Sequence, residues 1–263
     1  MNILLIGTPS NSLISAVQAS QMLGKLFTAS DEPINDIPNI QYFSLENLAQ
    51  KAKTLQIDVA INTDKSLIDQ NIVEIFRENR VNLISVNKKW LNLETSRLAS
   101  KKLMDFYSIN NPKIIKAPMK FPVVLKTDLG DFSEVKNSME ELLQSAETMK
   151  DSKKFVEEYL DGEEFELLSL WDGKSIYCLN SPTPTNEVKE DRLYLLKTKL
   201  SFMFSDEKAD FTGLFTVRLV WAKNDWYVKD FSADINKESL FNDINKDFLY
   251  ILDSAIYQKL NEI

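Results

Sequence analysis

Strand-like and helix-like segments alternate over the first 90 residues, and this order constrains the fold more than any other feature of the chain. Short apolar runs suited to buried strands alternate with segments in which apolar side chains recur every three or four residues. Such alternation favours a parallel sheet with right-handed helical crossovers. The strands are expected at Asn2–Ile6, Ile57–Ile61 and Val81–Val86, and the helices at Leu13–Leu23, Leu45–Leu55 and Leu67–Glu78. We therefore expect a Rossmann-like domain at residues 1–90.

Prolines separate this domain from the rest of the chain. A helix is expected at Leu93–Ser108, with Lys101 and Lys102 on its outer face, and prolines then interrupt the chain. Residues 91–121 are therefore expected to connect the first domain to a second, α+β unit at residues 122–263. Its expected strands are Val123–Lys126, Ser175–Leu179, Leu214–Val220 and Trp226–Phe231, and its expected helices are Met139–Met149 and Asp247–Leu260.

Composition excludes several classes of function. Because the chain contains no histidine, it lacks an imidazole base and any nucleophile–histidine pair. Its one cysteine, Cys178, lies in an apolar run and excludes an internal disulfide. The net charge of −8 argues against nucleic acid or an anionic membrane as the main partner. No targeting segment or transmembrane-length apolar run stands out, so a cytoplasmic location is expected.

The segment Phe155–Leu170 carries the most informative pattern in the second unit. Paired acids, an aromatic–aliphatic step and an Asp-Gly-Glu-Glu turn lie between two strand-like runs. This segment resembles the interdomain hinge of ATP-grasp enzymes, most closely glycinamide ribonucleotide synthetase (phosphoribosylamine–glycine ligase). An ordinary β-hairpin with solvated acids is the alternative interpretation.

Further segments resemble the same family in the same order. They are Met1–Gly7, Ile57–Ile61, Leu93–Met104, Pro122–Asp128, Phe211–Phe215 and Val228–Ser232. The resemblance implies an α/β fold, with a Rossmann-like (pre-ATP-grasp) parallel-sheet domain followed by an ATP-grasp α+β unit. The lobes of that unit are expected at residues 122–171 (small) and 172–263 (large). The family's C-terminal domain is expected to be absent.

The resemblance also implies a nucleotide site, with ATP and Mg²⁺ as its cofactors. Lys126 stands where the family places a lysine on the ATP phosphates, and Arg97 replaces a second lysine that faces the nucleotide. In the hinge, Glu157, Tyr159 and Leu160 correspond to the part that reads adenine, and Glu164 corresponds to the acid that holds the ribose. The metal strand is matched by Asp230 and Ser232, which stand for a glutamate and an asparagine.

The sequence departs from the family where phosphates would be held. The glycine- and lysine-rich loop is reduced to Leu129–Glu134, and Asp234 stands where the family has an arginine. Thr8–Leu13 and Pro182–Glu187 replace two further loops, the second of them glycine-rich in the family. Because carboxylates repel a triphosphate unless a metal intervenes, these changes predict weakened nucleotide binding.

Three functions follow from this comparison. The first is a degenerate ATP-grasp protein, a pseudoenzyme with weak or no nucleotide binding that acts by binding a ligand or a partner. The second is an active ATP- and Mg²⁺-dependent carboxylate–amine ligase with an altered substrate, of the type found in purine biosynthesis. The third is an interaction module that binds a protein partner or a second copy of itself. Its surface would include Trp90, Trp221 and Trp226, for which core packing is the alternative role.

Overall fold

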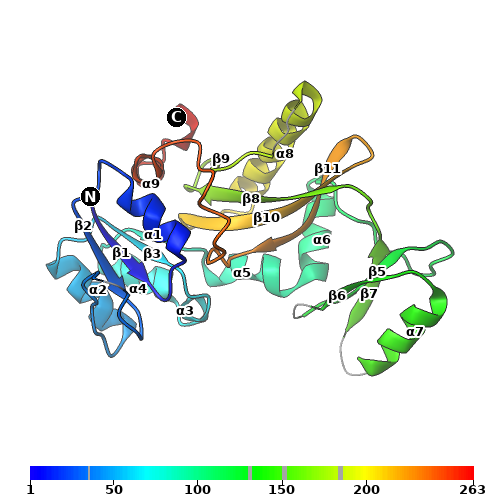
Figure 1. The fold of residues 1–263 in the computed structure, drawn as a ribbon, viewed down its shortest axis with the longest axis horizontal. Coiled ribbons are helices and arrows are strands. Elements are labelled where there is room, and N and C mark those ends of the chain that lie inside the picture. The colour runs from blue at the N-terminus through cyan, green and yellow to red at the C-terminus, as the bar shows by residue number, and fades with distance from the viewer. Residues whose placement is uncertain (35, 130–131, 150–152, 183–185) are drawn as a thin grey trace.

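The computed structural model spans residues 1–263 and describes all of them except 35, 130–131, 150–152 and 183–185. Its described residues form three sheets, which follow one another along the chain (Figure 1). The protein is a mixed α/β structure with one parallel and two antiparallel sheets, as the sequence predicted. No helix within the described ranges is both long enough and apolar enough to cross a bilayer.

The first sheet is parallel, and its strands lie in the order β2-β1-β3-β4. Its strands are β1 (Asn2–Ile6), β2 (Lys25–Ala29), β3 (Val59–Asn62) and β4 (Leu83–Ile84). Its helices are α1 (Asn11–Gln18), α2 (Leu45–Thr54), α3 (Ser66–Asp69) and α4 (Ile72–Glu78). The expected alternation is confirmed, with β2 as an additional strand that the sequence did not predict. The single helix predicted at Leu67–Glu78 is wrong, because Asn71 adopts a left-handed backbone between α3 and α4.

Alternate side chains of β1 enter different cores. Ile3 and Leu5 pack in one core, whereas Leu4 and Ile6 pack in another with residues of α2 and α4. The first of these cores also contains α9 (Phe248–Ile256), near the end of the chain, which is followed by the 3₁₀ turn η1 (Leu260–Glu262). The last helix therefore packs against the first sheet, far from it in sequence.

Two helices connect the first sheet to the second unit. They are α5 (Lys88–Thr95) and α6 (Arg97–Phe106), so the single helix predicted at Leu93–Ser108 is wrong. Ser96 breaks the helix because its backbone is extended, and its hydroxyl accepts a hydrogen bond from the Ala99 N–H at the start of α6.

The small antiparallel sheet follows, in the order β6-β5-β7. Its strands are β5 (Val123–Thr127), β6 (Ser133–Lys136) and β7 (Lys154–Glu158), with α7 (Met139–Thr148) beside them. A small core of Val123, Leu125 and Leu142 joins α7 to this sheet. The segment Leu129–Glu134, where the sequence analysis finds the family's phosphate loop reduced, leads into β6, and its residues 130 and 131 lie outside the described residues.

The large antiparallel sheet has the order β11-β10-β8-β9. Its strands are β8 (Glu163–Trp171), β9 (Ile176–Cys178), β10 (Gly213–Ala222) and β11 (Asp225–Ser232). One face carries α8 (Glu187–Asp206), a 20-residue helix that the sequence did not predict. Leu193, Leu196 and Phe204 of α8 pack into an aromatic core, which includes the stacked rings of Trp90 and Phe204 at 4.5 Å.

The tryptophans proposed for a partner surface mostly belong to this core. Trp90 is 5% exposed and Trp226 is 1% exposed, and Trp221 is partly buried against the same cluster. Their alternative role in core packing is therefore confirmed for Trp90 and Trp226.

Candidate functional site

The predicted hinge connects two different sheets. Strand β7 ends at Glu158 in the small sheet, and β8 begins at Glu163 in the large sheet. These strands pair with β5 and with β10, respectively, so the segment is not a hairpin. A Cβ atom at Gly162 would lie 2.1 Å from the Trp221 carbonyl oxygen. Glycine is therefore required where the chain crosses from one sheet to the other.

Glu157 of β7 is buried between two lysines. Its Oε1 lies 2.8 Å from Lys126 Nζ of β5, and its Oε2 lies 2.7 Å from Lys101 Nζ of α6. All three side chains are at most 4% exposed. The prediction that Lys101 lies on an outer face is wrong, because α6 turns it inward together with Arg97 and Met104. Burying a carboxylate costs desolvation free energy, and the two ammonium partners offset that cost.

The ion pairs continue from Lys126 into the large sheet. Lys126 Nζ lies 3.9 Å from Asp230 Oδ2 on β11, and Arg218 of β10 holds Asp230 with both arms of its guanidinium group, at 2.7 and 2.5 Å. This bidentate contact raises the pKa of Arg218. Charges therefore alternate along one chain, which is Lys101, Glu157, Lys126, Asp230 and Arg218. We call these five residues the ion-pair chain.

Lys126 has no well-directed hydrogen bond to any described residue, although Glu157 lies at 2.8 Å. Lys101 is better satisfied, since its ammonium group donates to the Pro112 carbonyl oxygen at 2.6 Å. Burial lowers the pKa of Lys101, and the Glu157 charge opposes this effect. Within the ion-pair chain, each charge thus has an opposite charge nearby, but Lys126 lacks a hydrogen bond of good geometry.

Arg97 connects α6 to the end of β5. Its guanidinium group donates to the carbonyl oxygens of Thr127, at 3.1 Å, and Phe132, at 2.7 Å. Beside it, Asp128 accepts hydrogen bonds from the Leu98 N–H at 2.9 Å and from the Ser96 hydroxyl. Arg97 therefore has a structural role in holding the small sheet against α6.

The other predicted hinge residues lie closer to solvent. Tyr159 is 39% exposed and Leu160 is partly buried. Glu164, on β8, is exposed and forms an ion pair with Lys229 of β11. Glu157 alone among these predicted hinge residues is part of the ion-pair chain.

A cavity of about 100 Å³ lies between the large sheet and α5–α6. Three predicted site residues, Arg97, Asp230 and Ser232, line it. The remaining lining residues are Glu94, Glu166, Thr216, Arg218, Phe231 and Lys237. Pockets that hold a drug-sized ligand usually measure roughly 300–1,000 Å³. The cavity is therefore too small for a nucleoside triphosphate in the arrangement that the structure shows.

The residues at the predicted metal strand are already engaged. Both Asp230 oxygens accept from Arg218, and the Ser232 hydroxyl accepts from the Asp234 N–H at 3.1 Å. No group of three or more acidic, cysteine or histidine side chains among the described residues is arranged to hold a metal ion. Asp230 and Ser232 share the cavity, as their alternate positions on a strand predict. Their geometry does not fit Mg²⁺, because an arginine occupies the carboxylate that the metal would need.

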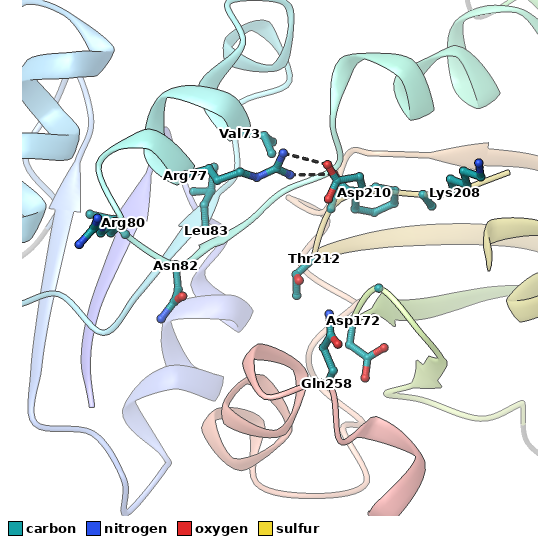
Figure 2. A pocket seen from close by; sticks show the side chains of 14 residues that line it. Val73, Arg77, Arg80, Asn82, Leu83, Asp172, Lys208, Asp210, Thr212 and Gln258 are labelled. Carbon is teal, nitrogen blue, oxygen red and sulfur yellow. Dashed lines mark hydrogen bonds and ion pairs between the residues drawn. The ribbon is translucent and has the colours of Figure 1, made fainter. Parts of the chain in front are cut away.

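A larger cavity, of about 550 Å³, lies away from the ion-pair chain (Figure 2). The C-terminal ends of α4, α8 and α9 meet at this cavity. The residues that follow their C-caps adopt left-handed backbones, and these residues are Arg80, Lys208 and Gln258. Cations at helix C-termini compensate the helix dipoles. Arg77 also donates to Asp210 across this cavity at 2.9 Å. Arg77, Arg80 and Lys208, three of the five charged residues that line this cavity, thus lie at or just after helix C-termini, where positive charge is favourable.

Comparisons with known proteins identify the class of fold. No protein-family model matches the chain. Among solved structures, phosphoribosylamine–glycine ligase from Thermotoga maritima superimposes with a TM-score of 0.74 at 16% identity, covering 98% of this chain and 76% of that one. A biotin carboxylase from Campylobacter jejuni gives a TM-score of 0.62 at 14% identity, covering 91% of this chain and 66% of that one. The chain has the ATP-grasp fold.

Sequence comparison finds similarity to one enzyme with this fold. Phosphoribosylamine–glycine ligase from Fusobacterium nucleatum is 23% identical over an alignment 319 residues long, gaps included, which covers all of this chain and 75% of that protein. The enzyme of the same name from Clostridium acetobutylicum is 24% identical over 279 residues, covering 87% of this chain and 67% of that protein. The chain therefore has the ATP-grasp fold and is similar in sequence to these phosphoribosylamine–glycine ligases.

Two residues of the ion-pair chain were missed in the sequence, namely Lys101 and Arg218. Lys101 could have been found because it shares a helical face with Arg97 and Met104, at intervals of four and three residues. Arg218 is two residues after Thr216 on β10, so both side chains face the same cavity. No local signal marks it as the partner of Asp230, because the contact depends on the pairing of β10 with β11.

Proposed function

We propose that this protein is a phosphoribosylamine–glycine ligase-like pseudoenzyme, which acts by binding a ligand or a protein partner and does not transfer phosphoryl groups. One observation carries the proposal, namely that acids of the chain itself neutralise Lys126. Glu157 lies 2.8 Å and Asp230 lies 3.9 Å from its ammonium group. A lysine serves a triphosphate by presenting an uncompensated positive charge, and this charge is already compensated.

The surrounding electrostatics support the same conclusion. Catalysis of phosphoryl transfer depends on positioned positive charge and metal ions around the transferred group. In this cavity Arg218 is bound by Asp230, and Lys237 forms an ion pair with Glu166. Arg97 donates to backbone carbonyl oxygens. Each cation at the cavity therefore already has a partner within the chain.

The proposal includes a cytoplasmic location, which cell fractionation would test.

An active carboxylate–amine ligase is the second candidate. It is favoured because predicted site residues from distant parts of the sequence lie together in the structure. Arg97, Asp230 and Ser232 come from distant segments and line one cavity, with Lys126 next to Asp230. Lys126 also lacks a well-directed hydrogen bond, so a phosphate oxygen would supply a missing acceptor. Such an enzyme would join a carboxylate to an amine at the expense of ATP, and Mg²⁺ could bind at Asp230 only if Arg218 released that carboxylate.

Nucleotide turnover distinguishes the two candidates. The intact chain is mixed with ATP and Mg²⁺, with and without glycine and phosphoribosylamine, and ADP release is measured beside calorimetric binding of ATP. We expect no ADP release above that of buffer, and Lys126→Met should change nothing. The matched control is Lys102→Met, on the exposed side of the same helix as Lys101. ADP release that is lost in Lys126→Met and kept in Lys102→Met would refute the pseudoenzyme and establish the ligase.

A further inference from the structure

Helix α8 carries an exposed apolar stripe in addition to its buried face. Val188, Leu195 and Phe202 recur every seven residues and are 55%, 48% and 61% exposed. A spacing of seven residues keeps side chains on nearly the same side of a helix, as in helix–helix seams. Figure 1 shows α8 extending outward from the large sheet that its buried face covers. Large exposed apolar patches on a folded protein commonly mark an interaction site.

The stripe continues onto α6 through a row of aromatic rings. The Phe202 ring lies 5.8 Å from the ring of Tyr107, which lies 4.9 Å from the ring of Phe106. Phe106 is itself 76% exposed. Aromatic side chains are enriched in protein interfaces because they bury much area at small entropic cost. The patch therefore consists of Phe106, Val188, Leu195 and Phe202, and we call it the α8 patch.

We propose that the α8 patch binds a second copy of this chain, with the two α8 helices antiparallel and the two-fold axis passing near Leu195. Val188 precedes Leu195 by seven residues and Phe202 follows it by seven. In an antiparallel pair centred on Leu195, each Val188 therefore faces the Phe202 of the other copy. A two-fold interface requires such self-complementarity, since the same patch supplies both sides.

The charges flanking the stripe are complementary in the same register. The exposed Asp191 lies four residues before Leu195, and Lys199, whose ammonium group donates to the Ser108 carbonyl oxygen at 2.6 Å, lies four residues after it. Two other cations of the helix are engaged within the chain, since Arg192 pairs with Asp225 and Lys189 pairs with Glu163. Asp191 and Lys199 are each four residues from the centre, so they face one another across the axis. A parallel pair would instead place like charges together, which disfavours it.

This surface is separate from the ion-pair chain. Along β10, Phe215, Val217 and Leu219 face the core under α8, whereas Thr216 and Arg218 face the cavity on the opposite side of the sheet. Dimerisation and nucleotide turnover can therefore be tested independently, and the inference does not rest on the proposed function.

Sedimentation velocity and site-specific crosslinking of the full chain test the proposal. The wild-type chain should sediment with twice its own mass at high concentration. Leu195→Cys should form a disulfide-linked dimer when diamide takes up the two electrons and two protons of the thiols, because cysteines on the axis meet at bonding distance. The native Cys178 is 4% exposed and does not compete. Phe43→Cys, at a site that is 87% exposed, is the control that should not crosslink efficiently.

Charge reversal tests the register. Asp191→Lys or Lys199→Asp alone should weaken the dimer roughly tenfold, because each change replaces two attractive pairs with two repulsive ones. The double variant should restore the wild-type dissociation constant. A wild-type chain that stays monomeric would overturn the proposal, as would a dimer in which Leu195→Cys crosslinks no better than Phe43→Cys. Single reversals without effect would overturn the antiparallel register.

Discussion

Replacing Glu157 with glutamine tests whether the ion-pair chain holds the lobes together. The substitution keeps the shape of the side chain and removes its charge. It leaves the ammonium groups of Lys101 and Lys126, which are 4% and 2% exposed, without their shared carboxylate. Asp230, at 3.9 Å from Lys126, is the nearest remaining acid in the ion-pair chain, and Arg218 already binds it.

The expected cost is large because two buried charges lose their partner at once. Removing one member of a buried ion pair typically costs about 3–5 kcal/mol, since the remaining charge is left desolvated. A typical protein is stable by only about 5–15 kcal/mol, so Glu157→Gln should remove a substantial part of the total. Lys126→Met should cost less, because Glu157 keeps Lys101 at 2.7 Å.

Urea unfolding at neutral pH, followed by the fluorescence of the buried Trp171 and Trp226, measures these costs. The matched control is Glu158→Gln, at the next residue, whose carboxylate pairs with the exposed Lys223. It should cost no more than about 1 kcal/mol. If Glu157→Gln costs as little as this control, the ion-pair chain does not stabilise the fold and our interpretation of the site is wrong.

The same variant should also show a characteristic dependence on pH. Burial lowers the pKa of Lys101 below its ordinary value, and the Glu157 charge counteracts this. Without Glu157 the pKa of Lys101 in the folded state should fall further. The unfolded chain then binds more protons than the folded chain between that lowered pKa and the ordinary lysine value, so stability rises with pH across this window. A stability of Glu157→Gln that is flat or falls between neutral and alkaline pH would contradict this reasoning.

Three further predictions concern single positions. Gly162→Ala should destabilise the protein by about 1–3 kcal/mol in urea unfolding, because its Cβ would lie 2.1 Å from the Trp221 carbonyl oxygen. Gln56→Gly should stabilise it by about 0.5–1 kcal/mol, since Gln56 follows α2 with a left-handed φ of 54°. Burial raises the pKa of Asp128, but hydrogen bonds from the Leu98 N–H and from Lys153 outweigh this and leave it below its ordinary value. The advantage of wild type over Asp128→Asn should therefore be present at neutral pH and disappear as the pH falls through that lowered pKa.

Much of the first sheet could be predicted because its signals are local. Ile3–Ile6 is a continuous apolar run, and the structure buries all four of its residues in β1. Strand β2, with the sequence KLFTA, was missed because it begins with an exposed lysine and carries the polar Thr28 at a buried position, so no continuous apolar run marks it. Helix α8 was missed for a different reason. Apolar side chains occur on its outer stripe as well as on its buried face, so helical periodicity is weak.

The ion-pair chain could not be predicted because its contacts join distant segments. Lys101 and Glu157 are 56 residues apart, and Lys126 and Asp230 are 104 residues apart. Lysine and glutamate are almost always exposed, so sequence patterns place them at the surface by default. Each is buried here only because the others are, and this mutual dependence is a property of the packed lobes and not of any single segment.

Whether Lys126 can bind a phosphate therefore depends on the acids around it more than on its place in the sequence. The sequence predicted a phosphate-binding lysine on the strand that became β5, and the structure places this lysine beside the predicted site. For a triphosphate to bind it, the ligand would have to compete with Glu157 at 2.8 Å and draw Lys126 away from Asp230. A ligand shifts such an equilibrium only by the difference between its affinities for the two arrangements. Glu157 already fills the role of the anion without the entropic cost of association. A nucleotide phosphate that binds Lys126 therefore has to displace Glu157, and Glu157→Gln, which frees Lys126, should bind ATP more tightly than the wild-type chain does.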